Sequence, residues 1–182
     1  MEFTPLQTVR LTLRLHSPSD IPALMPLIGA REVAATTLRI PHPYTESDAQ
    51  DFMADTKEEL LNGSGLRLGI VVRQGDTLCG GVGLRMESDH RRAELGYWIG
   101  VPYWGKGYAT EAAGAMVNYG FKRLGLHRIF ASHLVDNSAS ARVLRKIGMR
   151  HEGTQRGHIL KWGKFLDLEM YGMLASDLDS AA

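Results

Sequence analysis

The stretch from Ala93 to Ala112, AELGYWIGVPYWGKGYATEA, decides how this chain folds. Its first part, up to Ile99, is rich in residues that favour a strand, and its last part is rich in good helix formers. Two glycines, Gly105 and Gly107, lie between the two parts. A strand, a glycine turn and a helix predict a phosphate-binding site. The N–H groups of a first helical turn lack backbone partners, and glycines let an anion approach them closely.

Three kinds of phosphate ligand use such a turn. A dinucleotide fingerprint, G-x-G-x-x-G, matches poorly because Thr110 stands at the third glycine position. Gly100, Gly105 and Lys106 fit the Walker spacing G-x-x-x-x-G-K, but Gly107 replaces the Ser or Thr that would hold magnesium. A coenzyme A pyrophosphate needs backbone amides alone. These residues therefore leave a nucleotide and coenzyme A both open.

Three motifs carry a family resemblance. They are AELGYWI at residues 93–99, WGKGYATEA at residues 104–112, and N-x-x-S-x-x-V-L-x-K-x-G-M at residues 137–149. Together they resemble the GNAT acetyltransferases, and within them the branch named for the RimJ and RimL ribosomal-protein N-terminal acetyltransferases. The similarity covers nearly the whole chain. One departure is Pro102, which stands where the superfamily's acyl-CoA signature usually begins with Gln or Arg.

Length and composition describe an ordinary globular protein. The chain has 182 residues, of which 44% are hydrophobic and 23% charged, and its net charge is +1. This balance gives no reason to expect a nucleic-acid or membrane partner, and we expect neither a signal peptide nor a membrane span. One cysteine, Cys79, suits a reducing cytoplasm. We expect a single GNAT domain over residues 1–182, with a core of about 8–175.

Hydrophobic periodicity predicts the element order β-α-α-β-β-β-α-β-α-β-β, which is also the GNAT order and indicates a mixed α/β (α+β) fold. A helix capped by Ser17 or Ser19 follows the first strand, and the stretch 29–44 is expected to be irregular. The strands between residues 66 and 100 should form an antiparallel meander. Strands are predicted at 9–15, 66–73, 77–86, 92–100, 128–135, 149–158 and 164–174, and the later helices at 45–62, 108–124 and 138–147.

The resemblance implies a reaction: transfer of an acetyl group from acetyl-CoA to an amine. It implies that the central strand separates from the next one, at an irregularity near Gly96 or Gly100, and leaves backbone free for the cofactor. The backbone of Ile99 and Val101 would then pair with the pantetheine arm. The pyrophosphate would be held by the amides of Gly105, Lys106, Gly107, Tyr108, Ala109 and Thr110.

The second half of the chain supplies further candidates. The resemblance gives the Asn137 side chain a contact with pantetheine, although Asn is also a good helix N-cap. It places Ser140 where this branch presents a hydroxyl to the thiol; a helical Ser is also commonly inert. Arg142 and Lys146 are candidates for the phosphates, or else belong to a solvated basic face.

Glu94, at the head of the central strand, is the candidate base, acting directly or through a water. Partial desolvation would raise its pKa towards the range a base needs. The alternative is an exposed strand residue paired with Arg92.

No metal site is expected, because the seven histidines and one cysteine show no metal-ligand spacing. His133 is a remote alternative base, and is otherwise a packed strand residue.

The acceptor is the least determined part. A protein N-terminal amine leads because of the branch, and polyamines, amino acids and antibiotics stay open. The irregular stretch 31–44 and the turn 157–163 should contact it. Two other classes compete: a non-catalytic acyl-CoA-binding domain, and an ATP- or GTP-binding enzyme. Members of this branch are often dimers, so a homodimer is a further expectation.

Overall fold

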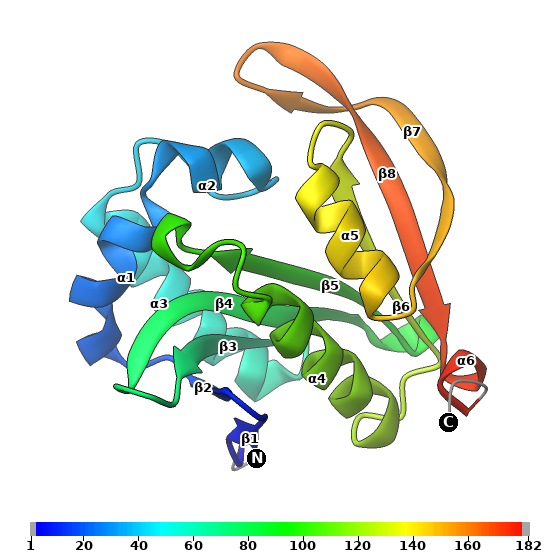
Figure 1. Ribbon diagram of the computed structural model, residues 1–182, viewed down its shortest axis with the longest axis horizontal. Helices are drawn as coiled ribbons and strands as arrows, with labels where there is room; N and C mark the ends of the chain where they lie inside the picture. The colour runs from blue at the N-terminus through cyan, green and yellow to red at the C-terminus, as the bar shows by residue number, and fades with distance from the viewer. Residues whose placement is uncertain (1–2, 180–182) are drawn as a thin grey trace.

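One sheet of eight strands runs through the protein in the order β1-β2-β3-β4-β5-β6-β8-β7 (Figure 1). The computed structural model describes residues 3–179. The strands are β1 (Leu6–Gln7), β2 (Leu11–Leu15), β3 (Gly65–Val72), β4 (Thr77–Glu87), β5 (Arg92–Ile99), β6 (Arg128–Leu134), β7 (Arg150–Lys161) and β8 (Lys164–Leu174). The helices are α1 (Ile21–Ile28), α2 (Arg31–Thr36), α3 (Glu46–Asn62), α4 (Tyr108–Lys122), α5 (Ser138–Lys146) and α6 (Ala175–Asp179), with 3-10 turns η1 (Pro18–Asp20), η2 (Ser88–His90) and η3 (Val101–Tyr103).

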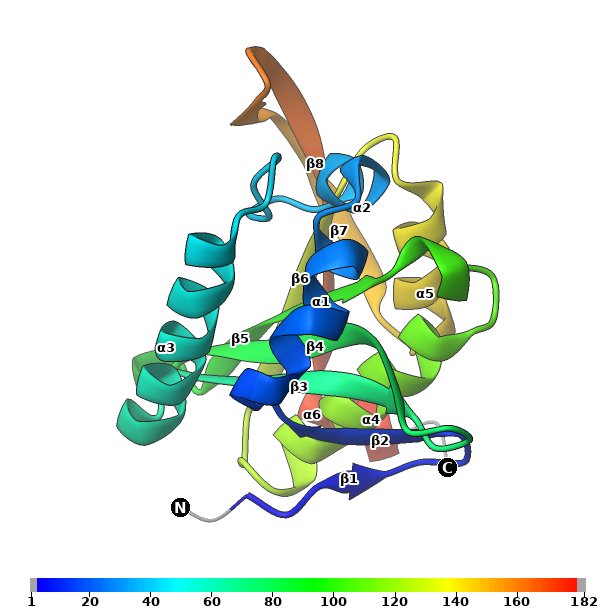
Figure 2. The same cartoon turned by 90° about the vertical axis from the view of Figure 1, so that its left-hand side faces the viewer.

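Helices cover both faces of this sheet. Helices α1 and α3 pack on one face, while α4 and α5 lie on the other (Figures 1 and 2). The alternation in β2 explains how a strand serves such a sheet: Leu11 and Leu13 are fully buried, whereas the intervening Thr12 is only half-buried. The antiparallel meander of β3, β4 and β5 is confirmed, and so is the mixed α/β fold.

Glycines in β4 make room for a large side chain on β5. A Cβ atom on Gly81 would lie 2.6 Å from Nε1 of Trp98, and one on Gly80 would lie 2.3 Å from the Trp98 carbonyl oxygen. Real side chains do not approach so closely, so only glycine lets Trp98 lie across β4 towards α1 and α3.

The second predicted helix begins as its sequence indicates. The Thr45 hydroxyl accepts a hydrogen bond from the Asp48 amide, and the Asp48 carboxylate accepts one from the Thr45 amide. This is a capping box, and α3 ends at Gly63 with φ +73°.

Several element predictions are wrong in detail. The stretch 29–44 contains α2, a helix too short to show a clear periodicity, in which Val33 and Ala34 are buried. Neither Ser17 nor Ser19 caps α1, because η1 precedes that helix and Asp20 is its N-cap. The strand predicted from residue 9 is β2 and begins at Leu11, and β1 and α6 were not predicted. Strand β5 pairs with β4 in unbroken register from Arg92 to Ile99, so the pairing with β4 has no bulge at Gly96, whereas the pairing with β6, the next strand, ends at Glu94.

Strands β7 and β8 form a hairpin that extends beyond the rest of the sheet (Figure 1). Its tip is joined to the segment after α2, because the Lys161 ammonium group donates a hydrogen bond of 2.7 Å to the Thr37 carbonyl. The guanidinium group of Arg31 also lies over the Trp162 ring, 5.6 Å from its centre. These contacts close one side of the space between the hairpin and α2.

Candidate active site

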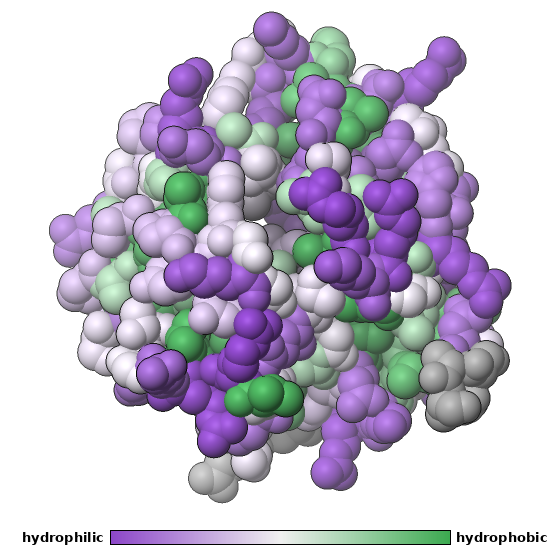
Figure 3. Space-filling model, in the orientation of Figure 1, coloured by the Kyte–Doolittle hydropathy of each residue, from purple (hydrophilic) through white to green (hydrophobic). Residues whose placement is uncertain are grey.

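The sheet opens between β5 and β6. These parallel strands pair only over three residues, from Arg92 with Arg128 to Glu94 with Phe130. Beyond that point β5 continues beside β4, and β6 continues beside β8. A cavity of about 940 Å³ reaches into this opening. Figure 3, in the orientation of Figure 1, shows a hollow near the middle of the face towards the viewer. A cavity of this size is large enough for a cofactor.

The predicted glycine turn lies at one end of this cavity. Gly105 and Gly107 have φ values of +74° and +80°, which L-residues with a side chain rarely adopt. Gly107 is the N-cap of α4, and the first helical backbone bond runs from the Glu111 amide to the Gly107 carbonyl. The amides of Tyr108, Ala109 and Thr110 therefore have no partner within the helix.

Helix α4 differs here from α3 and α5. Those two helices are capped by the side chains of Thr45 and Asn137, whereas Gly107 has no side chain with which to cap α4. The free amides and the positive end of the helix dipole thus remain available to an anion. This geometry fits a pyrophosphate group held without a metal.

Arg10 and Glu111 hold the turn in place. The Glu111 carboxylate accepts hydrogen bonds from the Thr8 hydroxyl and from the amide and Nε of Arg10, each at 2.7 Å. Arg10 in turn donates through Nη1 to the Lys106 carbonyl at 2.8 Å. Desolvation alone would raise the pKa of Glu111, but these hydrogen bonds lower it below its usual value. Glu111 therefore ties the turn to β2 and is not directed at the cavity chemistry.

The end of β5 is already hydrogen-bonded. The indole Nε1 of Trp104 donates to the Ile99 carbonyl at 2.6 Å, and the Trp104 amide donates to the Val101 carbonyl at 3.1 Å. Val101 lies in η3, past the end of the strand. In the same turn, the Lys106 side chain lies over the Tyr103 ring. Pairing of Ile99 with a pantetheine arm stays a prediction, and it requires the carbonyl to share or release the indole.

Helix α5 forms the opposite wall. The Asn137 side chain accepts a hydrogen bond from the Ser140 amide at 3.0 Å and donates one to the Thr36 carbonyl at 3.1 Å. It is therefore the N-cap of α5, as its residue type allowed, and it also joins α5 to α2. Arg142 and Lys146 are exposed and line the cavity, so both are placed to meet a phosphate.

Ser140 has a partner that sequence reasoning missed. Its hydroxyl oxygen lies 2.7 Å from the hydroxyl oxygen of Tyr97, on β5 across the opening. Burial raises the pKa of Tyr97 to about 12, more than the hydrogen bond with Ser140 lowers it. Tyr97 therefore keeps its proton at neutral pH. The sequence signal for it was its spacing of two residues from Leu95 and from Ile99, which places all three side chains on the face of β5 that α4 and α5 cover.

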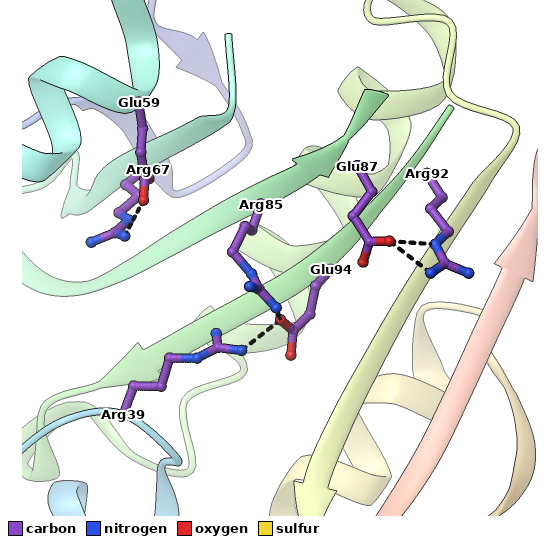
Figure 4. Close-up of polar contacts among 7 residues, drawn as sticks. All are labelled: Arg39, Glu59, Arg67, Arg85, Glu87, Arg92 and Glu94. Carbon is purple, nitrogen blue, oxygen red and sulfur yellow. Dashed lines mark hydrogen bonds and ion pairs between the residues drawn. The ribbon is translucent and has the colours of Figure 1, made fainter. Parts of the chain in front are cut away.

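Glu94 projects from the other face of β5 and meets two arginines. Its Oε2 atom accepts hydrogen bonds from Arg39 Nη2 at 2.8 Å and from Arg85 Nη2 at 2.6 Å (Figure 4). Among residues 3–179, no hydrogen bond to Oε1 is found. The alternative, an exposed residue paired with Arg92, is wrong, because the Glu94 side chain is only 11% exposed and Arg92 pairs with Glu87 (Figure 4).

The expected rise in the pKa of Glu94 is also wrong. Desolvation is the largest single influence and acts to raise it. The hydrogen bonds and charges of Arg39 and Arg85 together outweigh desolvation, so the pKa lies below its usual value. Glu94 is consequently an ionised carboxylate with one oxygen anchored and the other free.

A second cavity, of about 460 Å³, adjoins the first at Arg39, Arg85 and Glu94. Strands β4, β5 and β6 form its floor, and the β7–β8 hairpin contributes Gln155, His158 and Ile159 to its wall. His158 and Ile159 belong to the 157–163 region, and the predicted contact of that region with the acceptor stays a prediction. The remaining lining residues are Leu38, Glu87, Arg92, Arg128, Phe130, Ser132, Leu168 and Met170.

The remaining candidates lie in the protein interior. His133 is buried and its Nδ1 atom bonds the carbonyl of the next residue, and Cys79 is fully buried. Over the described residues, no cluster of His, Cys, Asp or Glu is arranged to hold a metal ion. Within the same range, no helix has both the length and the apolar character required to cross a bilayer.

Comparison with known proteins agrees with this geometry. The family model described as the acetyltransferase (GNAT) domain matches residues 10–150. The chain is 33% identical to p20, an N-acetyltransferase of Bacillus licheniformis, over 93% of this chain and 95% of p20. It is 28% identical to YdaF of Bacillus subtilis, whose name proposes a ribosomal N-acetyltransferase, over 94% and 95% of the two chains.

Solved structures show the same fold. A GNAT-family acetyltransferase from Bacillus anthracis superposes with a TM-score of 0.84 at 27% identity, covering 95% of this chain and 99% of that one. Fold, glycine turn and sequence matches thus lead to one assignment. The chain belongs to the GNAT family, the enzymes that transfer an acetyl group from acetyl-CoA to an amine.

Proposed function

We propose that this enzyme acetylates the N-terminal amine of a peptide or protein, by direct attack of the amine on acetyl-CoA within one ternary complex. A single observation carries the proposal: the free amides of α4 and the Glu94 carboxylate line the same cavity, which reaches through the opening between β5 and β6. A ligand held at one end can therefore react with an amine held at the other. The whole chain, residues 1–182, acts as one domain in this scheme.

The co-substrate supplies an activated acetyl thioester, and the chain supplies the groups that hold it. In this proposal the amides of Gly105, Lys106, Gly107, Tyr108, Ala109 and Thr110 bind the pyrophosphate. Arg142 and Lys146 add positive charge from α5. Asn137 contributes mainly by fixing the start of α5, and through it the position of Ser140.

Glu94 is proposed to accept the proton of the attacking amine, directly or through a water. Its Oε2 atom is held by two arginines, which fixes the carboxylate, while its Oε1 atom has no protein partner among residues 3–179. A carboxylate with a low pKa is a weak base but a good ligand for an ammonium group. Glu94 would therefore position the amine as well as receive its proton.

Ser140 is proposed to protonate the departing thiolate. When the amine nitrogen forms a bond to the carbonyl carbon, the carbon–sulfur bond breaks and the sulfur needs a proton. Ser140 can give one and recover it from Tyr97, since the two hydroxyl oxygens are 2.7 Å apart. The proton taken by Glu94 returns to solvent, and the Tyr97–Ser140 pair is restored by a proton from solvent.

A peptide N-terminus suits the acceptor end. The hairpin tip is bonded to Thr37 by Lys161, which favours a narrow chain end over a broad folded surface. The relative YdaF adds support through its name. A polyamine is the second candidate, because Asp48, Asp51 and Asp55 line another part of the large cavity.

The test has two steps. Calorimetric titration should show micromolar binding of acetyl-CoA and none of magnesium-ATP. Release of CoA thiol is then measured with N-terminal peptides, free amino acids and spermidine as acceptors. Binding without transfer to any amine would favour a non-catalytic acyl-CoA domain, and binding of ATP alone would overturn the proposal.

A further inference from the structure

The cavity beside Glu94 is rich in arginine. Arg39, Arg85, Arg92 and Arg128 line it, whereas Glu87 and Glu94 are its only carboxylates among the described residues. Glu152 lies outside this wall and pairs with Arg128. Even with Glu152 included, four cations face three carboxylates, so one positive charge has no protein counterion there.

The arginines form ordered rows on one face of the sheet. Arg85 is directly opposite Glu94, and Arg92 is directly opposite Glu87. Arg128 lies beside Arg92 on the next strand. Side chains opposite each other on a sheet face are neighbours, so these groups form a continuous polar floor.

These arginines keep hydrogen-bond donors that the protein does not use. Arg92 contacts Glu87 through Nε and Nη2, and Arg85 contacts Glu94 through the same two atoms (Figure 4). Within the part of the chain that the structure describes, Nη1 of both side chains has no partner. Unused guanidinium donors in a cavity match a carboxylate or phosphate acceptor.

The spacing suggests where such an anion lies. Arg92 and Glu94 are on the same face of β5, two residues apart, which corresponds to about 7 Å along a strand. An amine at Glu94 and an anion at Arg92 would thus be separated by about two residues of extended peptide.

Extending the proposed function, on which this inference rests, we propose that the preferred acceptor carries a carboxylate about 7 Å from its reacting amine, bound by Arg92 and its arginine neighbours. In a peptide this is an Asp or Glu side chain close behind the N-terminus. A free acidic amino acid is too short to span this distance, because only three or four bonds join its amine to its side-chain carboxyl carbon, a reach of about 4 to 5 Å. A polyamine, which carries only positive charges, is disfavoured at this cavity, and the aspartates of α3 make no contact with Glu94 among the described residues.

The experiment compares matched acceptors. Tetrapeptides with the N-terminal sequences Ala-Asp and Ala-Asn are of equal size and differ only in the charge of the second residue. Free aspartate and asparagine form the small-molecule arm, and spermidine the cationic arm. We expect kcat/KM for Ala-Asp to exceed that for Ala-Asn about tenfold, the size of effect usual for a charge-assisted hydrogen bond.

Two variants locate the site. Arg92→Gln should reduce the ratio of the two peptide kcat/KM values towards one. Arg150→Gln is the matched control: Arg150 is likewise bonded to a carboxylate, Asp177, but is outside both cavities, and the ratio should not change. Acetyl-CoA affinity, measured by calorimetry, verifies that each variant is folded.

Three results would overturn the inference while leaving the transferase assignment intact: equal kcat/KM for the two peptides, free aspartate as a better acceptor than the Ala-Asp peptide, or spermidine as the better acceptor. Binding of both peptides to the CoA-loaded protein is measured as well, so the charge preference is tested even if transfer is slow. Failure of acetyl-CoA to bind, or of every amine to react, is a different result, which removes the proposed function itself.

Discussion

The hydroxyl groups of Tyr97 and Ser140 lie 2.7 Å apart, although the two residues are 43 positions apart in the sequence. Among residues 3–179 neither hydroxyl donates to a carboxylate, and Tyr97 keeps its proton because burial raises its pKa to about 12. Within the described chain, Tyr97 is the only tyrosine whose hydroxyl group is hydrogen-bonded to the hydroxyl group of Ser140, the proposed acid.

Ser140→Ala should lower kcat roughly 100-fold, and Tyr97→Phe about tenfold, since the latter removes one hydrogen bond to the group that gives the proton. If the two act in series, the double variant should be no slower than Ser140→Ala alone. Steady-state kinetics measures all three, with Tyr119→Phe, which packs on Phe3 away from the cavity, as the control. Additive losses would mean that the hydroxyls act separately.

Glu94→Gln should lower kcat about 100-fold without removing the acidic limb of the pH–rate profile between pH 6 and pH 8. The two arginines lower the pKa of Glu94, so this carboxylate is already ionised in that range. The limb should instead report protonation of the acceptor amine, whose pKa is about 8 for an α-amino group. Profiles of kcat/KM for both proteins check this, and disappearance of the limb in the variant would contradict it.

Gly105→Ala should weaken acetyl-CoA binding about tenfold or more, because a methyl group there enters the cavity beside the α4 amides. Gly63→Ala is its matched control. The two glycines have φ values of +74° and +73°, and neither has an atom within 4 Å of an added Cβ. Both variants should therefore lose similar stability, about 1 kcal/mol, in thermal unfolding. Equal acetyl-CoA affinity in the two would show that the turn does not hold the co-substrate.

His16 should make the protein less stable as the pH falls from 6.5 to 4. Both its ring nitrogens are buried without a hydrogen-bond partner, and desolvation lowers its pKa to about 4. The unfolded chain, with a His pKa near 6.5, takes up the proton first, so acid favours unfolding by up to about 3 kcal/mol. Urea unfolding of wild type and His16→Phe, at pH 7.5 and at pH 4.5, should show a smaller pH effect in the variant. An equal change in unfolding free energy between the two pH values in wild type and variant would contradict the role of His16.

The sequence predicted local features well and distant partners poorly. The turn between β5 and α4 was predictable because glycine, strand formers and helix formers each act within a few residues. The capping box of Thr45 and Asp48 was predictable for the same reason. Helix α2 was missed because six residues show too little periodicity.

The surroundings of Glu94 were not predictable. Its partners Arg85 and Arg39 are 9 and 55 residues away in sequence, and only the sheet register and the segment after α2 bring them together. The nearest arginine in the sequence, Arg92, was therefore the wrong choice. Tyr97 was missed in a similar way, since its importance comes from a partner on α5 and not from its own strand.

The short pairing of β5 with β6 has a consequence for handling the protein. Beyond Glu94 and Phe130 the two strands do not pair with each other, so backbone edges face the opening in the interior of the sheet, with only the Ile99 carbonyl bonded there by the Trp104 indole among the interactions described above. Unpaired edges readily add a strand from another chain and are starting points for aggregation. A co-substrate that fills this opening would cover both edges. Purified protein stored with CoA should therefore remain clear on heating longer than protein stored without it, and light scattering would record the difference.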